Sequence, residues 1–251
     1  MTGRLTVHSG VAALVSAMWM IGAASAADLP ARMYTKAPPP PSPMFNWTGF
    51  YVGVNVGGSW GHQDVSLVGL ATGGNSVNGV IGGGQIGYNW QGPNSPWVFG
   101  IEADIQGSGQ RATGAFFLPA GVGALPIPAT NIAYEDRLDW FGTVRGRIGW
   151  AMGDGRFLPY ITGGYAYGEG NLNGTATSGA TTVAFNTNKT YSGWTLGAGI
   201  EWAFWQRWSA KAEYLYVDFG NGPTVALAPG FVLTTNHLTD NIGRVGVNYR
   251  F

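Results

Sequence analysis

The sequence predicts an all-β fold, an eight-stranded antiparallel transmembrane up-and-down β-barrel. Three observations predict it: apolar and polar residues alternate from residue 47 to residue 251, aromatic residues gather at the strand ends, and the connections alternate between short and long. Alternation in segments of about ten residues is typical of transmembrane strands, because one face of each strand meets lipid and the other meets the lumen.

The composition agrees with this fold and excludes several classes of function. The chain has 251 residues, 42 glycines, no cysteine, and 13 basic and 13 acidic side chains. Zero net charge gives no electrostatic reason for a nucleic-acid partner. The absence of cysteine excludes disulfides, thiolate metal sites and a cysteine nucleophile. Charged residues make up only 10% of the chain, which suits a β protein whose exterior does not face water.

Residues 1–26 have the features of a secretory signal peptide. Arg4 supplies the positive charge, residues 11–21 form an apolar run, and residues 24–26 have the small side chains of a cleavage site. The apolar run is too short for a transmembrane helix. We therefore expect cleavage after Ala26 and export of the remaining chain.

Residues 27–45 are predicted to form a proline-rich periplasmic linker, and residues 46–251 the barrel. Prolines dominate residues 38–43, which excludes regular helix and sheet there and favours polyproline II. The linker is either a spacer close to the peptidoglycan or a disordered segment that leads into the barrel.

The eight predicted strands follow in order along the rest of the chain. They comprise residues 50–57, 80–91, 97–106, 137–150, 157–168, 194–204, 208–216 and 237–251. In the first strand Val52 and Val54 share a face opposite Gly53, and in the last strand Val245 and Val247 do the same. The fifth strand is rich in Gly and Tyr, and its alternation is weaker. Every strand thus supplies one apolar face for lipid.

Connections of two lengths join these strands. The short ones are predicted at residues 91–96, 153–156 and 205–207, and the long ones at residues 61–76, 111–134, 169–188 and 220–236, where the pattern is weak. Short periplasmic turns and long external loops are the rule for outer-membrane barrels. An even number of strands then places both barrel termini in the periplasm.

Aromatic residues provide a check on this arrangement. One group lies beside the termini and short turns: Trp47, Tyr88, Trp90, Trp97, Trp150, Tyr160, Trp202, Trp208, Tyr249 and Phe251. A second group lies near the long connections: Trp60, Trp140, Trp194 and Tyr216. Two aromatic belts match two membrane interfaces, whereas a soluble β-sandwich would concentrate its aromatic residues in mid-strand.

Charged residues of the strands fall on the other face, which we expect to line the lumen. The predicted lumen network comprises Glu102, Asp104, Arg137, Asp139, Arg145, Arg147, Glu201, Lys211, Glu213, Arg244 and Arg250. A charge on the lipid face at mid-depth would cost about 2–4 kcal/mol. Side chains can fill a barrel of eight strands, so we predict a lumen plugged by ion pairs, with Arg145 and Arg147 facing Glu102 and Asp104. A narrow ion path remains an alternative.

No arrangement in the sequence indicates catalysis. Two neighbouring arginines would keep Glu102 and Asp104 ionised, so these residues do not form an acid–base pair. Residues 82–87 match the pattern G-x-G-x-x-G, but they lie inside a predicted strand rather than at a strand-to-helix turn. No set of Ser, His and acidic residues can be assembled at the membrane rim. We therefore predict that the protein is not an enzyme and has no cofactor or metal.

Two histidines carry a separate hypothesis. His62 and His237 lie at the margins of the first and last long connections, so closure of the barrel can bring them together at its external rim. A pair of histidines there could bind a metal ion, haem or another small ligand.

Several stretches resemble the small outer-membrane β-barrel family of alphaproteobacteria, described as porin-family or immunogenic outer-membrane proteins. They include Trp-Thr-Gly-Phe-Tyr-Val-Gly at residues 47–53, Gly-Gln-Ile-Gly-Tyr-Asn-Trp at residues 84–90 and Val-Gly-Val-Asn-Tyr-Arg-Phe at residues 245–251. The resemblance covers residues 45–251 and implies an OmpA-like transmembrane barrel in the bacterial outer membrane. It also implies contact with lipid and lipopolysaccharide, and a role for Tyr249 and Phe251 as the signal that the outer-membrane assembly machinery recognises.

The sequence and the resemblance together predict a non-enzymatic protein of the cell envelope with a structural and surface-interaction role, in which the loops meet an external ligand or a host surface. A small passive channel and a surface receptor for haem or a small ligand are the two alternatives. The resemblance brings no catalytic residues with it.

Overall fold

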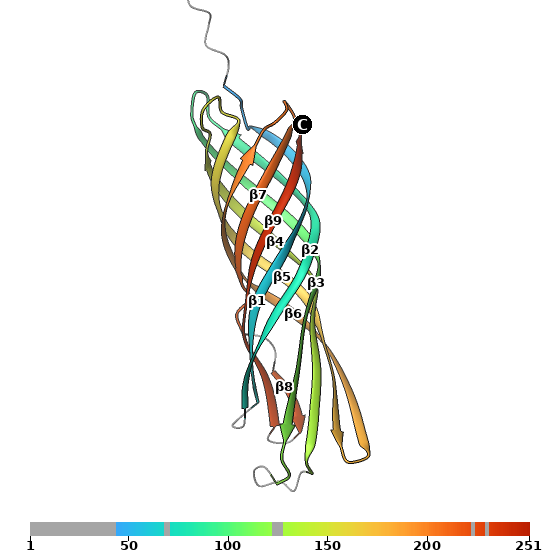
Figure 1. Cartoon of the computed structure of the whole chain (residues 1–251). Coiled ribbons are helices and arrows are strands. Elements are labelled where there is room, and N and C mark those ends of the chain that lie inside the picture. Colours follow the sequence, from blue (N-terminus) through green and yellow to red (C-terminus); the bar gives the residue numbers. More distant parts are fainter. Residues whose placement is uncertain (1–43, 68–70, 122–127, 222–223, 229–230) are drawn as a thin grey trace, which may run out of the picture. The chain divides into compact units, whose positions relative to one another are not determined.

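Nine strands form one antiparallel sheet that closes on itself in the computed structural model (Figure 1). The structure describes residues 44–67, 71–121, 128–221, 224–228 and 231–251, so the predicted signal peptide and nearly all of the linker lie outside it. The strands are β1 (Gly49–Leu67), β2 (Ala71–Gln91), β3 (Trp97–Leu118), β4 (Thr130–Trp150), β5 (Phe157–Ser178), β6 (Thr181–Trp202), β7 (Trp208–Asp218), β8 (Thr224–Ala228) and β9 (Phe231–Arg250). Consecutive strands pair from β1 to β7, β7 pairs with β9, and β9 pairs with β1. Eight strands therefore close a ring, which confirms the predicted barrel.

The short strand β8 is an addition to the predicted set. It pairs only with β9, through residues 224–228, and takes no part in the ring. The described part of the chain contains no helix that is long and apolar enough to cross a membrane.

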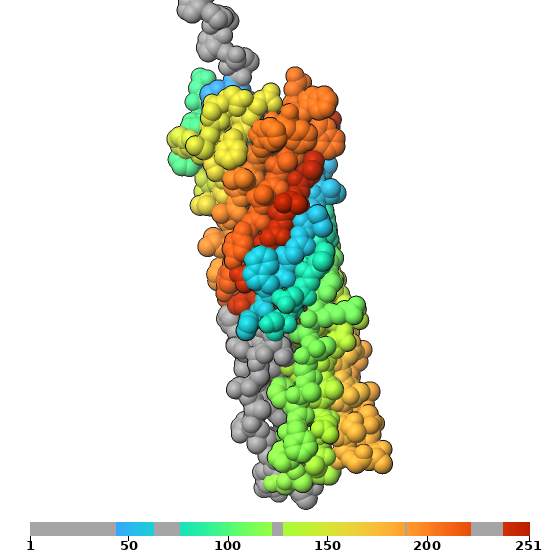
Figure 2. All heavy atoms as spheres, in the orientation of Figure 1, coloured from blue at the N-terminus to red at the C-terminus, as the bar shows by residue number. Residues whose placement is uncertain are grey.

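The outward face of the ring is apolar, as the alternation predicts. Val54, Val80 and Ile101 have 68%, 70% and 58% of their surface exposed, and Val245 has 57%. Figure 2 shows β7, β9 and β1 side by side on this face. Because large apolar side chains this exposed would be unfavourable in water, the outward face is the surface that lipid covers.

The two aromatic belts are also present, with two exceptions. Trp97 faces Trp150, and Trp208 faces Tyr249, across neighbouring strands at one end of the barrel. Trp47 and Tyr160, however, do not join that belt. Both are buried inside the barrel, with only 2% and 5% of their surface exposed.

The two ends of the barrel differ. One end carries the N-terminal start of β1, the C-terminus and tight turns, and we call it the short-turn end (upper end in Figure 1). Its turns use backbone conformations that few residues adopt: φ is 55° at Asn94, 64° at Gly153 and 85° at Gly155. We call the opposite end the long-hairpin end.

The long connections are not the irregular loops that the sequence predicts. At the long-hairpin end β1 and β2 pair as far as Leu67 and Ala71, and β5 and β6 pair as far as Ser178 and Thr181. The four strands β3 to β6 thus continue beyond the ring as a sheet of their own, formed by residues 112–118, 130–136, 171–178 and 181–193, which we call the hairpin sheet. Thr, Asn, Ala and Gly dominate these segments, so the period-two pattern is weak in the sequence even though the backbone is extended.

Irregularities in pairing change which face some residues occupy. The β3–β4 register shifts between Gly107 and Gln110, and the β4–β5 register shifts between Leu138 and Trp140. One extra residue in a strand reverses the alternation beyond it. Leu138, predicted to face lipid with Trp140, is therefore buried inside the barrel.

Candidate functional site: the charge cluster of the lumen

Eight charged side chains meet inside the barrel, and we call them the charge cluster. They are Glu102, Asp104, Arg145, Arg147, Glu201, Lys211, Glu213 and Arg244. Each has between 1% and 5% of its surface exposed. Four are acidic and four are basic, so the cluster is electrically balanced. All eight belong to the predicted lumen network.

Arg145 lies at the centre of one half of the cluster. Its Nη2 atom lies 3.0 Å from Oδ2 of Asp104, and its Nη1 atom lies 2.9 Å from Oε1 of Glu213. The register of β3 and β4 places it directly opposite Glu102, to which it donates a hydrogen bond of 2.5 Å. The predicted pairing of this arginine with Glu102 and Asp104 is therefore correct, and Glu213 is a third partner.

Two cations from the opposite part of the wall complete this half. Nη2 of Arg244 lies 2.9 Å from Oδ2 of Asp104 and 2.6 Å from Oε2 of Glu213. Nζ of Lys211 lies 2.9 Å from Oε1 of Glu102. Each carboxylate thus has more than one cationic partner, which is the arrangement that makes buried charge tolerable.

Arg147 organises the other half and pairs mainly with Glu201. Its Nη2 atom lies 2.6 Å from Oε2 of Glu201, whose other oxygen accepts hydrogen bonds from Ser209 and Asn248. The guanidinium also lies over the Tyr160 ring, 4.1 Å from the ring centroid. Its distance to Oε2 of Glu102 is 3.8 Å, so the predicted pairing with Glu102 is the weaker contact.

Two buried tyrosines, neither of which was predicted to line the lumen, join the halves. The Tyr51 hydroxyl donates to Glu102 at 2.7 Å and accepts from Arg147 at 3.2 Å. The Tyr160 hydroxyl donates to Glu213 at 3.0 Å. Together with Gln85, which donates to Asn248 at 2.6 Å, these residues connect the cluster to all eight strands of the ring.

Glycines in the wall make room for these rings. A Cβ atom on Gly87 would lie 2.4 Å from the Tyr51 ring, and one on Gly199 would lie 2.6 Å from the Tyr160 ring. No side chain fits at such distances. The high glycine content of the strands therefore has a packing cause: inward glycines leave the space that the lumen side chains fill.

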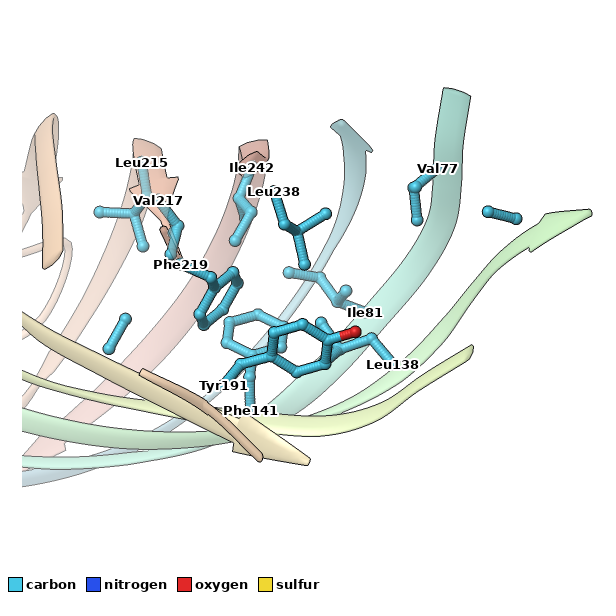
Figure 3. Packing of buried hydrophobic residues seen from close by; sticks show 12 residues of the cluster. Val77, Ile81, Leu138, Phe141, Tyr191, Leu215, Val217, Phe219, Leu238 and Ile242 are labelled. Carbon is cyan, nitrogen blue, oxygen red and sulfur yellow. The ribbon is translucent and has the colours of Figure 1, made fainter. Parts of the chain in front are cut away.

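Apolar side chains cover the charge cluster on the side of the long-hairpin end. Phe141, Ile81, Leu215 and Ile242 are completely buried and pack with Val77, Ala112, Leu138, Ala166, Tyr191, Val217, Phe219 and Leu238. Figure 3 shows these side chains converging from different strands. We call this group the apolar layer. The period-two pattern did not predict this layer, because the predicted plug consisted of ion pairs between charged side chains.

A second buried apolar group lies at the short-turn end. Val98, Leu158, Ala151, Ala203 and Trp47 form it, and Phe45 packs against them. Nε1 of Trp47 donates to the Gly155 carbonyl at 2.7 Å, and the backbone amide of Phe45 donates to the Asp154 carbonyl at 3.0 Å. The segment before β1 is thus fixed across this end of the barrel.

Three residues of the predicted lumen network do not belong to the charge cluster. Arg137 is 40% exposed and lies 3.6 Å from Glu135, and Asp139 is exposed, because the irregularity between Leu138 and Trp140 puts them outside the lumen. Arg250 lies at the short-turn end, where its guanidinium covers the Phe45 ring at 4.3 Å. The prediction of a lumen position was wrong for Arg137 and Asp139, and Arg250 contacts only the rim.

The remaining predicted residues lie at the two ends. Tyr249 stacks edge-on against Phe251 with 5.3 Å between ring centroids, and Phe251 is 70% exposed. His62 is exposed in β1 and lies opposite Thr239 in the β1–β9 register, two residues from His237. The backbone therefore brings the two histidine positions near each other, while the His237 side chain lies outside the described set.

Chemically, this arrangement pairs buried opposite charges with one another. Every carboxylate of the cluster is paired with a cation, and the whole cluster is enclosed. Among the described residues, no group of three or more His, Cys, Asp or Glu could hold a metal ion.

An antiparallel ring with a lipid-facing apolar wall, two aromatic belts and a charged interior defines a transmembrane β-barrel protein. The model of the outer membrane protein beta-barrel domain family matches residues 13–251. The chain belongs to this family, and its location is the bacterial outer membrane, where lipid and lipopolysaccharide surround it.

Curated relatives agree with this assignment. The 31 kDa outer-membrane immunogenic protein of Brucella melitensis biotype 1 is 34% identical over 254 residues, which covers 98% of this chain and all of the relative. The 22 kDa outer membrane protein of Rhizobium leguminosarum bv. viciae is 30% identical over 182 residues, covering 72% of this chain and 68% of the relative.

Solved structures of small barrels are similar at a lower level. Neisserial surface protein A matches with a TM-score of 0.37 and 14% identity, over 81% of this chain and 98% of that one. The outer membrane protease OmpT of Escherichia coli matches with a TM-score of 0.42 and 9% identity, over 84% of this chain and 99% of that one.

Proposed function

We propose that this protein is a non-enzymatic component of the outer membrane, with a structural role in the envelope and a surface-interaction role, and that its lumen is plugged. The observation that carries the proposal is the charge cluster. It is balanced, enclosed, and bonded to all eight strands of the ring, and apolar groups pack on both sides of it.

A plug of this kind opposes ion flow for two reasons. An ion that enters must break contacts such as the one between Arg244 and Glu213, which are close and shielded from water. It must also cross the apolar layer, where completely buried side chains such as Phe141 and Leu215 offer no polar partner to replace the ion's hydration water. A passive channel would need a continuous polar path, so it is the less favoured function.

The orientation follows from the two ends of the barrel. In outer-membrane barrels the short turns face the periplasm and the long connections face outward. We therefore place the short-turn end, both barrel termini and the proline-rich linker in the periplasm. The hairpin sheet then projects from the cell, and the naming of the Brucella relatives as immunogenic proteins supports this exposure.

The hairpin sheet is the surface that meets the environment. It is built from strands that continue out of the barrel wall, so the plugged barrel holds it rigidly above the membrane. An external ligand or a host surface would contact it, while lipopolysaccharide and lipid surround the barrel itself.

Planar-bilayer recording of the purified, folded protein tests the plug. We expect no conductance steps above those of empty detergent micelles over a range of voltage. Reproducible single-channel steps in the wild-type protein would refute the plugged lumen and favour the passive channel.

A further inference from the structure

Two edges of the hairpin sheet have no partner strand among the described residues. β6 pairs with β7 only from Trp194 to Trp202, and the backbone of Asp218 and Phe219 lies against Gly193, which leaves residues 181–192 paired on one side alone. β3 pairs with β2 only as far as Arg111, so residues 112–118 are likewise free on one side. The β6 edge is the longer of the two and spans about 40 Å at about 3.3 Å per residue.

We propose that the β6 edge, residues 181–192, binds an extended segment of another polypeptide as an additional antiparallel strand. The inference rests on the proposed function, because it requires the hairpin sheet to lie outside the cell, and it names the chemical class of the partner.

The edge itself defines this class. A free strand edge presents backbone N–H and C=O groups in alternation along its length. Only another extended backbone offers acceptors and donors with the same repeat, so a peptide strand satisfies the edge more completely than a sugar or a lipid headgroup does. Antiparallel pairing fits because every other pair in this sheet is antiparallel.

The usual protection against such pairing is missing. Native proteins block free edges with proline, with several charges or with very short strands. Residues 181–192 contain no proline and a single charged residue, Lys189. The side chains near the tip are accessible: Val183 is 60% exposed, and Thr181, Thr182 and Ala184 are also exposed. An incoming strand can therefore approach without a clash of charge.

A second copy in the same membrane does not fit as the partner. If β6 of one copy paired with β3 of the next, each copy would add four strands to a continuous sheet. At the usual spacing between strands, neighbouring copies would then lie about 19 Å apart. Eight tilted strands enclose a ring roughly 16 Å across between backbones, and the lipid-facing side chains widen it by several ångströms on each side. Neighbouring barrels would collide before the edges came within pairing distance. The partner is therefore a separate extended segment.

A suitable probe is a peptide with the sequence of a strand that already pairs with β6. The fluorescent probe is a synthetic peptide with the sequence of residues 168–178, Gly-Glu-Gly-Asn-Leu-Asn-Gly-Thr-Ala-Thr-Ser, because that segment pairs antiparallel with β6 on its other side. We expect saturable binding to the folded full-length protein in micelles. We also expect slower amide hydrogen exchange confined to residues 181–192. The same peptide with N-methyl groups on alternate amides keeps the side chains but removes backbone donors, and it should bind at least about tenfold more weakly.

A matched pair of deletions locates the binding. Asn171 and Asn188 lie opposite each other in the β5–β6 pair. Deleting residues 172–187 joins them directly as a two-residue hairpin turn and removes most of the β6 edge. Deleting residues 65–73 shortens the β1–β2 hairpin in the same way and leaves Asp64 and Gly74 as its turn. Binding should fall at least tenfold in the first variant and stay within twofold of wild type in the second. Gel migration of the unheated samples confirms that both barrels are folded.

Four results would overturn the proposal. Three concern the peptide: no saturable binding to the wild type, equal binding of the N-methylated peptide, or full binding by the variant that lacks residues 172–187. The fourth is displacement of the peptide by purified lipopolysaccharide, which would assign the edge to sugar chains. None of these results changes the bilayer recording, so the plugged barrel is tested separately.

Discussion

Nη1 of Arg145 on β4 lies 2.9 Å from Oε1 of Glu213 on β7, although β5 and β6 separate the two strands in the barrel wall. The contact therefore crosses the lumen. Arg145 also bonds Glu102 and Asp104 on β3, so one buried side chain connects three carboxylates from two sides of the ring.

Replacing Arg145 with Leu should destabilise the folded barrel strongly. The change keeps an apolar stem but leaves three buried carboxylates short of a cation, and breaking a buried pair costs about 3–5 kcal/mol. Urea unfolding in micelles measures the loss. Arg137→Leu is the matched control, because its pair with Glu135 is 40% exposed and a surface pair contributes about 0–1 kcal/mol. Equal effects of the two substitutions would contradict the central role of the cluster.

The apolar layer should contribute to stability independently of charge. Phe141 is fully buried, and its replacement by Ala should lower the free energy of unfolding by about 3–5 kcal/mol. Removal of the ring would leave a cavity that the neighbouring strands cannot close. Phe117→Ala is the control: its ring is 64% exposed, and we expect a change below about 1 kcal/mol. The same urea titration compares them, and a small effect of Phe141→Ala would show that the layer is loosely packed.

How much of this site the sequence could predict depends on position along the strands. Period-two alternation assigned Glu102, Asp104, Arg145 and Arg147 to the lumen correctly, because a charge on the lipid face is too costly. Alternation failed at Arg137 and Asp139, because a pairing irregularity reverses the faces and leaves no mark in the residue types. It also failed in residues 171–193. Beyond the membrane neither face must be apolar, so extended strands there resemble loops in sequence.

Tertiary contacts were the least predictable part. Tyr160 was assigned to an aromatic belt, yet its ring lies under Arg147 inside the barrel. An aromatic residue at a strand end can lie at a membrane interface or in the lumen. The Tyr160 ring fits in the lumen because Gly199, opposite it on β6, has no side chain to clash with the ring. That information lies on a neighbouring strand rather than near Tyr160 in the sequence.

The orientation can be tested directly because the natural chain contains no cysteine. Ala180→Cys places one thiol at the tip of the β5–β6 hairpin, and Gln206→Cys places one in a short turn; both positions are exposed. We expect a membrane-impermeant maleimide to label intact cells that carry the first variant but not the second. Both should react after the outer membrane is permeabilised. Labelling of Gln206→Cys alone in intact cells would reverse the proposed orientation.

The haem alternative makes its own prediction about His62 and His237. If the two residues form a ligand site, haem added to the wild type should shift the Soret band in a saturable way. His62→Ala and His237→Ala should each weaken binding at least about tenfold, because each removes one imidazole ligand. Unchanged titrations in both variants would eliminate this site without affecting the plugged-barrel proposal.

The C-terminal residue should matter more for assembly than for stability. Phe251 is 70% exposed and contacts Tyr249 edge-on, so few contacts are lost from the folded barrel when it is removed. We propose that its ring, at the end of the last strand, is what the assembly machinery recognises. Deletion of Phe251 should reduce the amount of folded protein in the outer membrane several-fold, measured by gel migration of unheated membrane fractions. The free energy of unfolding of the purified variant should change by less than about 1 kcal/mol. Phe204→Ala, another exposed aromatic residue at the short-turn end, is the control and should assemble normally. Normal assembly of the Phe251-deleted chain would refute the recognition role.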